Sequence, residues 1–99
     1  MSNDKKFIYV IYDTGRDRIK IGRSSNPEAR LKTLQTSNSD ELILQMKKER
    51  IHSTKFENWL HRQFAKNRKR GEWFEGVTAE EVSSKLMGCL LWDWDDDEY

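Results

Sequence analysis

The hydrophobic and polar positions in the first part of the chain predict a β-hairpin followed by a helix. The run FIYVIY at residues 7–12 is rich in β-branched and aromatic side chains, which favour strands. The next residues, DTGRD, supply a turn, and IKIG at 19–22 returns as a second strand. Asn26 and Pro27 are typical of a helix start, so a helix is expected from there to about Gln35.

The middle of the chain predicts a third strand and a second helix. The segment ELILQMKKER at 41–50 is expected to be the strand. The helix should run over about residues 53–70 and stop at the glycine that follows. Its apolar side chains recur every four residues, at Phe56, Leu60 and Phe64, and this spacing predicts the face that packs on the core.

The last part of the chain predicts a short extended segment, a third helix and an acidic tail. The segment EWFE is the extended piece, and Thr78 with Glu81 has the spacing of a capping box for a helix ending near Gly88. We expect one domain over residues 1–91 and a tail without a fixed fold at 92–99. The order β-β-α-β-α predicts an α+β fold in which helices pack on a small sheet.

Charge and composition narrow the classes of function. The net charge is +1, but residues 1–78 carry 17 Lys and Arg against 10 Asp and Glu, whereas residues 79–99 carry one Lys against seven acids. A basic body favours a polyanionic partner, although a solvated surface of mixed sign has the same composition. The single cysteine excludes an internal disulfide, and no apolar run approaches the roughly 20 residues of a membrane span. We expect a cytoplasmic protein with no membrane partner.

Three side chains near the predicted hairpin are candidates for chemistry on a phosphate. Lys20 lies in the strand that pairs with the strand of Tyr9, and a cation beside a phenol lowers the pKa of the phenol. An acidified Tyr9 would suit a general base, and a simply packed strand tyrosine is the alternative. Arg30 lies in the helix after the hairpin, where it is either a phosphate-binding fork or an ordinary exposed arginine.

Glu57 and His61 lie four residues apart and therefore on one face of the second helix. A carboxylate oxygen is a suitable ligand for a hard cation such as Mg²⁺. Thr54 and Glu57 also have the spacing of a capping box, so Glu57 has a purely structural alternative. For His61 the alternative is a partly buried helix residue with no part in catalysis.

Basic residues are frequent at the end of the second predicted helix and in the third predicted strand. Such clusters follow a nucleic-acid backbone by neutralising its phosphates, and a solvated helix end is the alternative. The candidates for nucleic-acid contact are Arg23, Lys47, Lys48, Lys66, Arg68, Lys69 and Arg70.

Together these positions resemble the GIY-YIG nuclease superfamily. The segment FIYVI, which begins at Phe7, is similar to the GIY element and keeps its tyrosine as Tyr9. The segment KIG, which begins at Lys20, is similar to the YIG element, with lysine where most members have tyrosine. Arg30 falls at the spacing of the family's helix arginine, and ENWLH from Glu57 resembles its metal-binding glutamate helix. KIGRSSNPEARL, ExxLH and GEWF are similar to the branch found in phage proteins and beside viral Bro-type domains.

The resemblance implies a three-stranded antiparallel sheet flanked by helices and a DNA endonuclease that uses a divalent metal, Mg²⁺ or Mn²⁺. Glu57 would hold the metal, and Tyr9 would act as the general base or orient the attacking water. Arg30 would stabilise negative charge around the phosphorus atom. Lys20 would act on Tyr9 or hold the nucleophile, and His61 would assist in orientation or proton transfer.

Two other functions fit the same sequence. One is a nucleic-acid-binding module of this fold with little or no cleavage activity, and the other is an interaction protein whose acidic tail docks a partner. The retained catalytic set favours the endonuclease, because a binding module needs cations but no isolated carboxylate in a basic site. DNA is the expected partner, and target choice would come from the domain's own surface, from self-association or from another protein.

Overall fold

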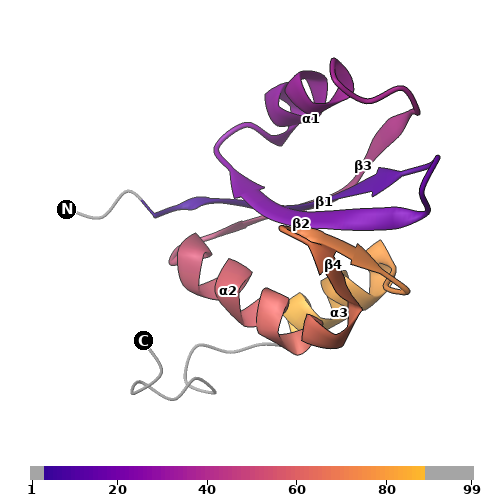
Figure 1. Ribbon diagram of the computed structural model, residues 1–99. Helices are drawn as coiled ribbons and strands as arrows, with labels where there is room; N and C mark the ends of the chain where they lie inside the picture. Colours follow the sequence, from indigo (N-terminus) through magenta and orange to yellow (C-terminus); the bar gives the residue numbers. More distant parts are fainter. Residues whose placement is uncertain (1–3, 89–99) are drawn as a thin grey trace.

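The computed structural model describes residues 4–88, in which one five-stranded antiparallel sheet has helices on both faces (Figure 1). The strands are β1 (Lys6–Asp13), β2 (Arg18–Ser24), β3 (Leu42–Arg50), β4 (Arg68–Arg70) and β5 (Trp73–Glu75). The helices are α1 (Pro27–Gln35), α2 (Ser53–Gln63), the short 3-10 helix η1 (Ala65–Asn67) and α3 (Ala79–Met87). The strands lie in the order β3-β1-β2-β5-β4, so β1 and β2 are central.

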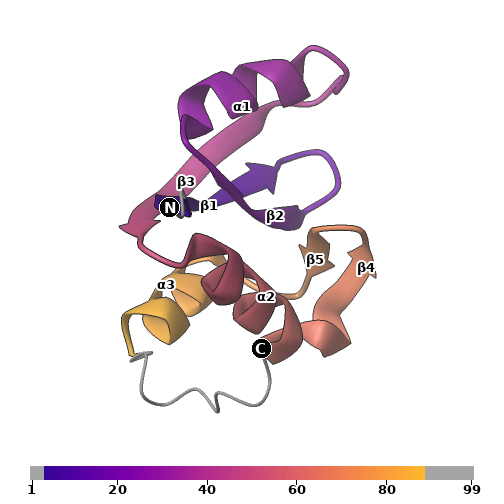
Figure 2. The same cartoon turned by 90° about the vertical axis from the view of Figure 1, so that its left-hand side faces the viewer.

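Side chains of the two central strands alternate between two hydrophobic layers. Helix α1 covers one face of the sheet, and α2 and α3 cover the other (Figure 2). On the α1 face, Tyr9 and Ile11 pack with Leu31 and Leu34. The opposite face carries the larger core, which includes Ile8, Val10, Ile19, Ile21, Phe56, Leu60, Phe74, Val82 and Leu86. Because both faces are covered, β1 is apolar almost throughout, whereas β2 places Lys20 between two buried isoleucines.

The local predictions for the hairpin and for the starts of two helices are confirmed. Strands β1 and β2 pair antiparallel, as their turn residues predict. Helix α1 begins at Pro27, and the side-chain oxygen of Asn26 accepts a hydrogen bond from the backbone N–H of Ala29 at 3.1 Å. At α3, the side chains of Thr78 and Glu81 each accept a hydrogen bond from the other residue's backbone N–H, which is the predicted capping box.

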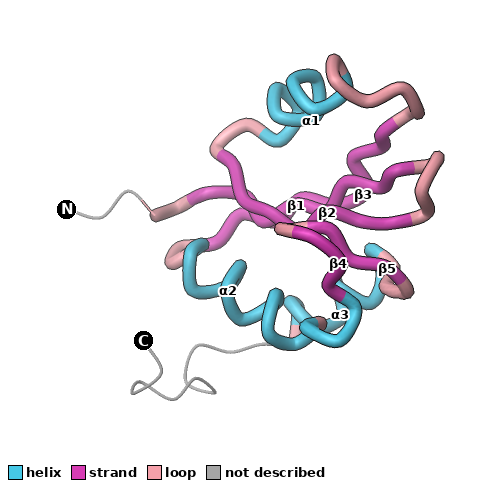
Figure 3. The backbone as a smooth tube through the Cα atoms, in the orientation of Figure 1, coloured by secondary structure: helices cyan, strands magenta, loops and turns pink. Residues whose placement is uncertain are grey.

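The predicted three-stranded sheet is wrong, because β4 and β5 extend the sheet on the free side of β2. The second helix ends at Gln63 rather than at Arg70. Residues 68–70 form an edge strand, which runs beside β5 in the tube drawing (Figure 3). Gly71, with φ +57°, makes the turn between these two strands and does not end a helix. The fold class is still α+β.

The acidic tail predicted at residues 92–99, and the end of the domain predicted over 1–91, lie outside the described residues. Within residues 4–88, none of the helices is both long enough and apolar enough to cross a membrane.

Candidate active site

The candidate catalytic residues meet around Gly22, near the end of β2. In the pairing of β1 with β2, Tyr9 lies directly opposite Gly22. A Cβ atom built on Gly22 would lie 2.6 Å from the hydroxyl oxygen of Tyr9 and 2.9 Å from Oε1 of Glu72. Because real Cβ atoms do not approach other atoms so closely, only glycine allows the phenol and the carboxylate to lie against the strand here.

Lys20 places a buried ammonium group beside this point. The residue pairs with Ile11 of β1 and with Trp73 of β5, so a neighbouring strand lies on each side of it. Its side chain is 10% exposed, and its Nζ lies 3.2 Å from Oε1 of Glu72 and 5.4 Å from the ring centroid of Trp73. A buried charge requires a charged or hydrogen-bonding partner, and the Glu72 carboxylate fulfils that need.

Tyr9 is 1% exposed and packs with Leu31 and Leu34 of α1. Burial raises the pKa of Tyr9, and the Glu72 carboxylate acts in the same direction, whereas a hydrogen bond from the Arg30 guanidinium opposes both. The pKa of Tyr9 is thus raised overall, opposite in direction to the acidification expected from a neighbouring lysine. A phenol held neutral at pH 7 is better suited to orient a water molecule than to remove its proton.

The start of α2 removes the structural alternative for Glu57. The helix begins at Ser53 after His52, so Thr54 is inside the helix and does not cap it. The cap comes instead from Asp4, whose carboxylate accepts a hydrogen bond from the backbone N–H of Thr54 at 3.2 Å. The Glu57 carboxylate is thus not used as a helix cap.

Glu57 points toward β2 in a region that is largely shielded from solvent. Its side chain is 12% exposed, and its Oε1 lies 3.6 Å from Nε of Arg23. Burial raises the pKa of Glu57 to about 7, and repulsion from the Glu72 carboxylate adds to this effect, while Arg23 opposes it. Two adjacent carboxylates ionise together only when positive charge is close by.

These surroundings fit a divalent cation at Glu57. Among residues 4–88, no group of three or more His, Cys, Asp or Glu side chains is arranged to hold a metal. Mg²⁺ is commonly bound by one or two carboxylates, with water and substrate phosphates as its other ligands. The shielded carboxylate of Glu57 is the group in this region that could serve as one such ligand.

His61 fixes α2 against the end of the β5 ladder. The backbone N–H of Ile21 donates to the carbonyl of Glu72 at 3.1 Å, and the carbonyl of Ile21 lies 2.8 Å from Nε2 of His61. Burial lowers the pKa of His61, so the ring is neutral and its Nε2–H donates to this carbonyl. The interaction places His61 in the site but occupies one of its two nitrogens, so the geometry favours orientation over proton transfer.

Comparison with known families places most of the chain in one domain family. The T5orf172 domain matches residues 6–89, which is most of the chain. The chain belongs to the T5orf172 domain family. This domain is phage-associated and nuclease-related. Neither a curated protein nor a solved structure matches the chain.

The basic candidates of this T5orf172 domain lie at opposite edges of its sheet and not along one helix. Edge strand β4 and the adjoining η1 carry Arg68, Lys69, Arg70 and Lys66, and edge strand β3 carries Lys47 and Lys48. Lys47 forms an ion pair with Glu28, and Lys69 lies 3.9 Å from Glu75. Arg23 belongs to the site itself, which therefore lies between the two basic edges.

Glu72 is the site residue that sequence reasoning missed. It lies directly after the turn at Gly71 and before β5, in the GEWF segment. One sequence signal could have found it, because it is the first acid after the basic run RKR. Like Glu57, Glu72 is a carboxylate beside several basic residues, where it can serve a purpose in the site.

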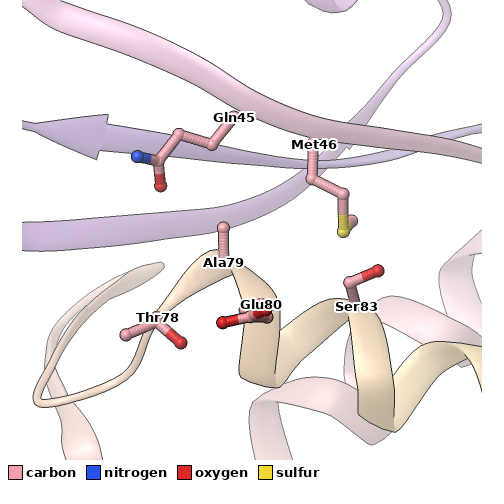
Figure 4. A pocket seen from close by; sticks show the side chains of 6 residues that line it. All are labelled: Gln45, Met46, Thr78, Ala79, Glu80 and Ser83. Carbon is pink, nitrogen blue, oxygen red and sulfur yellow. The ribbon is translucent and has the colours of Figure 1, made fainter.

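A groove elsewhere on the T5orf172 domain is separate from this site. It lies between β3 and the start of α3, and its lining residues are Gln45, Met46, Thr78, Ala79, Glu80 and Ser83 (Figure 4). The candidate catalytic side chains do not line it. Of the six residues that line it, Glu80 alone is ionisable, so the groove offers no comparable cluster of ionisable groups.

Proposed function

We propose that this T5orf172 domain is a metal-dependent DNA endonuclease of the GIY-YIG type, which hydrolyses phosphodiester bonds. The observation that carries the proposal is the meeting of a shielded carboxylate, Glu57, with Tyr9, Lys20 and the Arg30 guanidinium around Gly22. These groups come from β1, β2, α1 and α2. Ionisable groups of perturbed pKa in such a cluster are characteristic of active sites, whereas DNA binding alone requires only cations.

The cationic and phenolic groups would act directly on the scissile phosphate and on water. Arg30 is exposed on α1 and hydrogen-bonded to the Tyr9 hydroxyl, so its remaining N–H donors are available to phosphate oxygens. There it would stabilise the negative charge that develops during attack. The Tyr9 hydroxyl, held by Arg30, would orient the attacking water, and the Lys20 ammonium would add positive charge on the same side of the sheet.

Glu57 would hold Mg²⁺ or Mn²⁺, and such an ion stabilises charge on a phosphate as a Lewis acid. His61 would keep Glu57 facing β2, because its hydrogen bond to the Ile21 carbonyl fixes the last turn of α2, one turn beyond Glu57. Phe56 and Leu60 of the same helix pack into the core under the sheet and hold the helix there.

The exposed basic edge strand β4 would bind the DNA backbone beside the site. Arg68, Lys69 and Arg70 are exposed, and β4 pairs with β5, which in turn pairs with β2. Phosphate contacts of this kind supply affinity and position without reading sequence. Lys47 and Lys48 would contact DNA only at the far edge of the sheet, and self-association or a partner protein would complete target choice.

A plasmid assay tests this proposal. We expect the protein to convert supercoiled plasmid to nicked or linear DNA in Mg²⁺ or Mn²⁺, and to leave it intact after addition of a chelator. Binding of labelled duplex DNA, measured in Ca²⁺, should persist when cleavage is absent. DNA binding without any metal-dependent cleavage would instead identify a binding module and would overturn the endonuclease proposal.

Replacing Arg30 by lysine should lower the rate of cleavage by about 100-fold or more, with only a modest change in DNA affinity. Lysine keeps the charge but loses the planar fork that donates to Tyr9 and to phosphate together. The measurement is a single-turnover cleavage rate beside a binding titration. Arg16→Lys is the control, because Arg16 is exposed in the turn at the other end of the hairpin. Equal rates for Arg30→Lys and the control would exclude this role.

A further inference from the structure

We propose that Glu72 is a positioning residue of the candidate site, whose carboxylate holds the buried ammonium group of Lys20 beside the Tyr9 hydroxyl at Gly22. This inference deepens the proposed function and rests on it. Glu72 is not offered as a metal ligand or as a group that reacts with DNA.

The first observation is the burial of Lys20. Its side chain is 10% exposed, and the carboxylate that contacts it belongs to Glu72, with Nζ and Oε1 3.2 Å apart. Removing one partner of a buried ion pair leaves an uncompensated charge, which then moves toward solvent or toward another anion. The location of the Lys20 ammonium group thus depends on Glu72.

The second observation is that the backbone of Glu72 is itself fixed. Its carbonyl accepts the N–H of Ile21 at 3.1 Å, and the next residue, Trp73, pairs with Lys20 across the β2–β5 ladder. Gly71, in the left-handed region, turns the chain immediately before it. The backbone of Glu72 is therefore held in place, so its side chain can keep another side chain in position.

The third observation places this ion pair at the phenol. Oε1 of Glu72 and the Tyr9 hydroxyl oxygen lie 2.9 Å and 2.6 Å from the same point, the Cβ position of Gly22. Their separation cannot exceed the sum of these two distances. Lys20 and Gly22 are two residues apart on β2, so the ammonium held by Glu72 lies on the side of the sheet that carries the Tyr9 phenol.

Whether neutralising Glu72 slows or speeds cleavage distinguishes a positioning role from a purely electrostatic one. Glu72 is an anion in a site that must receive a polyanion, so its neutralisation alone should tighten DNA binding and favour cleavage. If Glu72 positions Lys20, neutralisation instead slows cleavage, because the freed ammonium is drawn toward Glu57, the other carboxylate nearby.

A double-mutant cycle tests the proposal with Glu72→Gln, Lys20→Met and the combined variant. Single-turnover rates at saturating Mg²⁺ should fall by about 100-fold in Glu72→Gln, the size expected when a reacting group is misplaced by about 1 Å. The combined variant should be no slower than Lys20→Met alone, because Glu72 acts through Lys20. DNA affinity in Ca²⁺ should be unchanged or tighter in Glu72→Gln, a result that loss of folding would not produce. Glu80→Gln, the same change at an exposed residue of α3, is the matched control.

Thermal unfolding of the same variants supplies a readout that does not require activity. Glu72→Gln should lower the melting temperature by several degrees, and adding Lys20→Met should restore part of this loss, because no unpaired charge is then buried. A Glu72→Gln variant that cleaves within twofold of the unaltered protein, or losses that multiply in the combined variant, would overturn the proposal. If the unaltered protein cleaves no DNA, the proposed function fails. The Lys20–Glu72 pairing is tested separately, because it is wrong if the melting-temperature shifts of the two single variants simply add in the combined variant.

Discussion

Glu57→Gln is expected to reduce metal-dependent DNA cleavage by at least about 10²- to 10³-fold while the fold stays intact. Glutamine has the shape of glutamate and can occupy the same space between Arg23 and Glu72. It lacks the negative charge that a divalent cation requires from its protein ligand. DNA binding measured in Ca²⁺ should change little, since the exposed basic strand β4 is unaltered.

The same substitution should stabilise the protein above neutral pH. Burial raises the pKa of the Glu57 carboxyl from its ordinary 4.5 to about 7, so the folded state binds this proton more tightly than the unfolded state. The unfolding free energy therefore falls as pH rises from 4.5 to about 7, and the full penalty applies above that range. Removal of the penalty should make Glu57→Gln more stable at pH 8 by roughly 1–3 kcal/mol, with no difference near pH 4.

Unfolding curves at pH 4 and pH 8, with and without Mg²⁺, measure both effects. Mg²⁺ should raise the melting temperature of the unaltered protein at pH 8, because an ion that binds only the folded state stabilises it. It should have no such effect on Glu57→Gln. Full cleavage activity in the glutamine variant, or an equal response of both proteins to Mg²⁺, would exclude Glu57 as the metal ligand. Glu80→Gln again supplies the matched exposed change.

Gly22→Ala is expected to lower the cleavage rate by about 100-fold and to destabilise the fold by roughly 1–3 kcal/mol. The new methyl group would lie 2.6 Å from the Tyr9 hydroxyl oxygen, 2.7 Å from its Cζ and 2.9 Å from Oε1 of Glu72. The Tyr9 ring is buried and cannot simply swing away, so the phenol, the carboxylate or β2 itself must move. Each of these shifts disturbs the alignment of the site.

Gly88→Ala provides the matched control for this steric effect. A Cβ atom on Gly88 would meet the backbone carbonyl oxygen of Ser84 at 3.5 Å, which is an ordinary contact, and the residue lies at the end of α3. Melting temperature and single-turnover cleavage, measured on both variants, should change only for Gly22→Ala. Normal cleavage by Gly22→Ala would show that close approach of Tyr9 and Glu72 to β2 is not required.

The sequence alone determined the elements whose signals are local. The turn residues after β1, the Asn26–Pro27 start of α1 and the Thr78 capping box each act over a few residues, and all three are present. The four-residue spacing of Phe56 and Leu60 likewise predicted the buried face of α2. Such features follow from backbone hydrogen bonding and side-chain periodicity, which need no distant partner.

Only the tertiary structure decided the features that depend on distant partners. Residues 68–70 carry helix-compatible side chains, but they pair with β5 and become an edge strand. The cap of α2 comes from Asp4, far away in the sequence, which left Glu57 unused as a cap. Burial raises the pKa of Tyr9, whereas a neighbouring lysine suggested that it would be lowered. The turn at Gly71 brings Glu72 into the site beside Lys20. Strand register and burial arise only when the whole chain has packed, and for that reason the composition of the site could not be completed from its motifs.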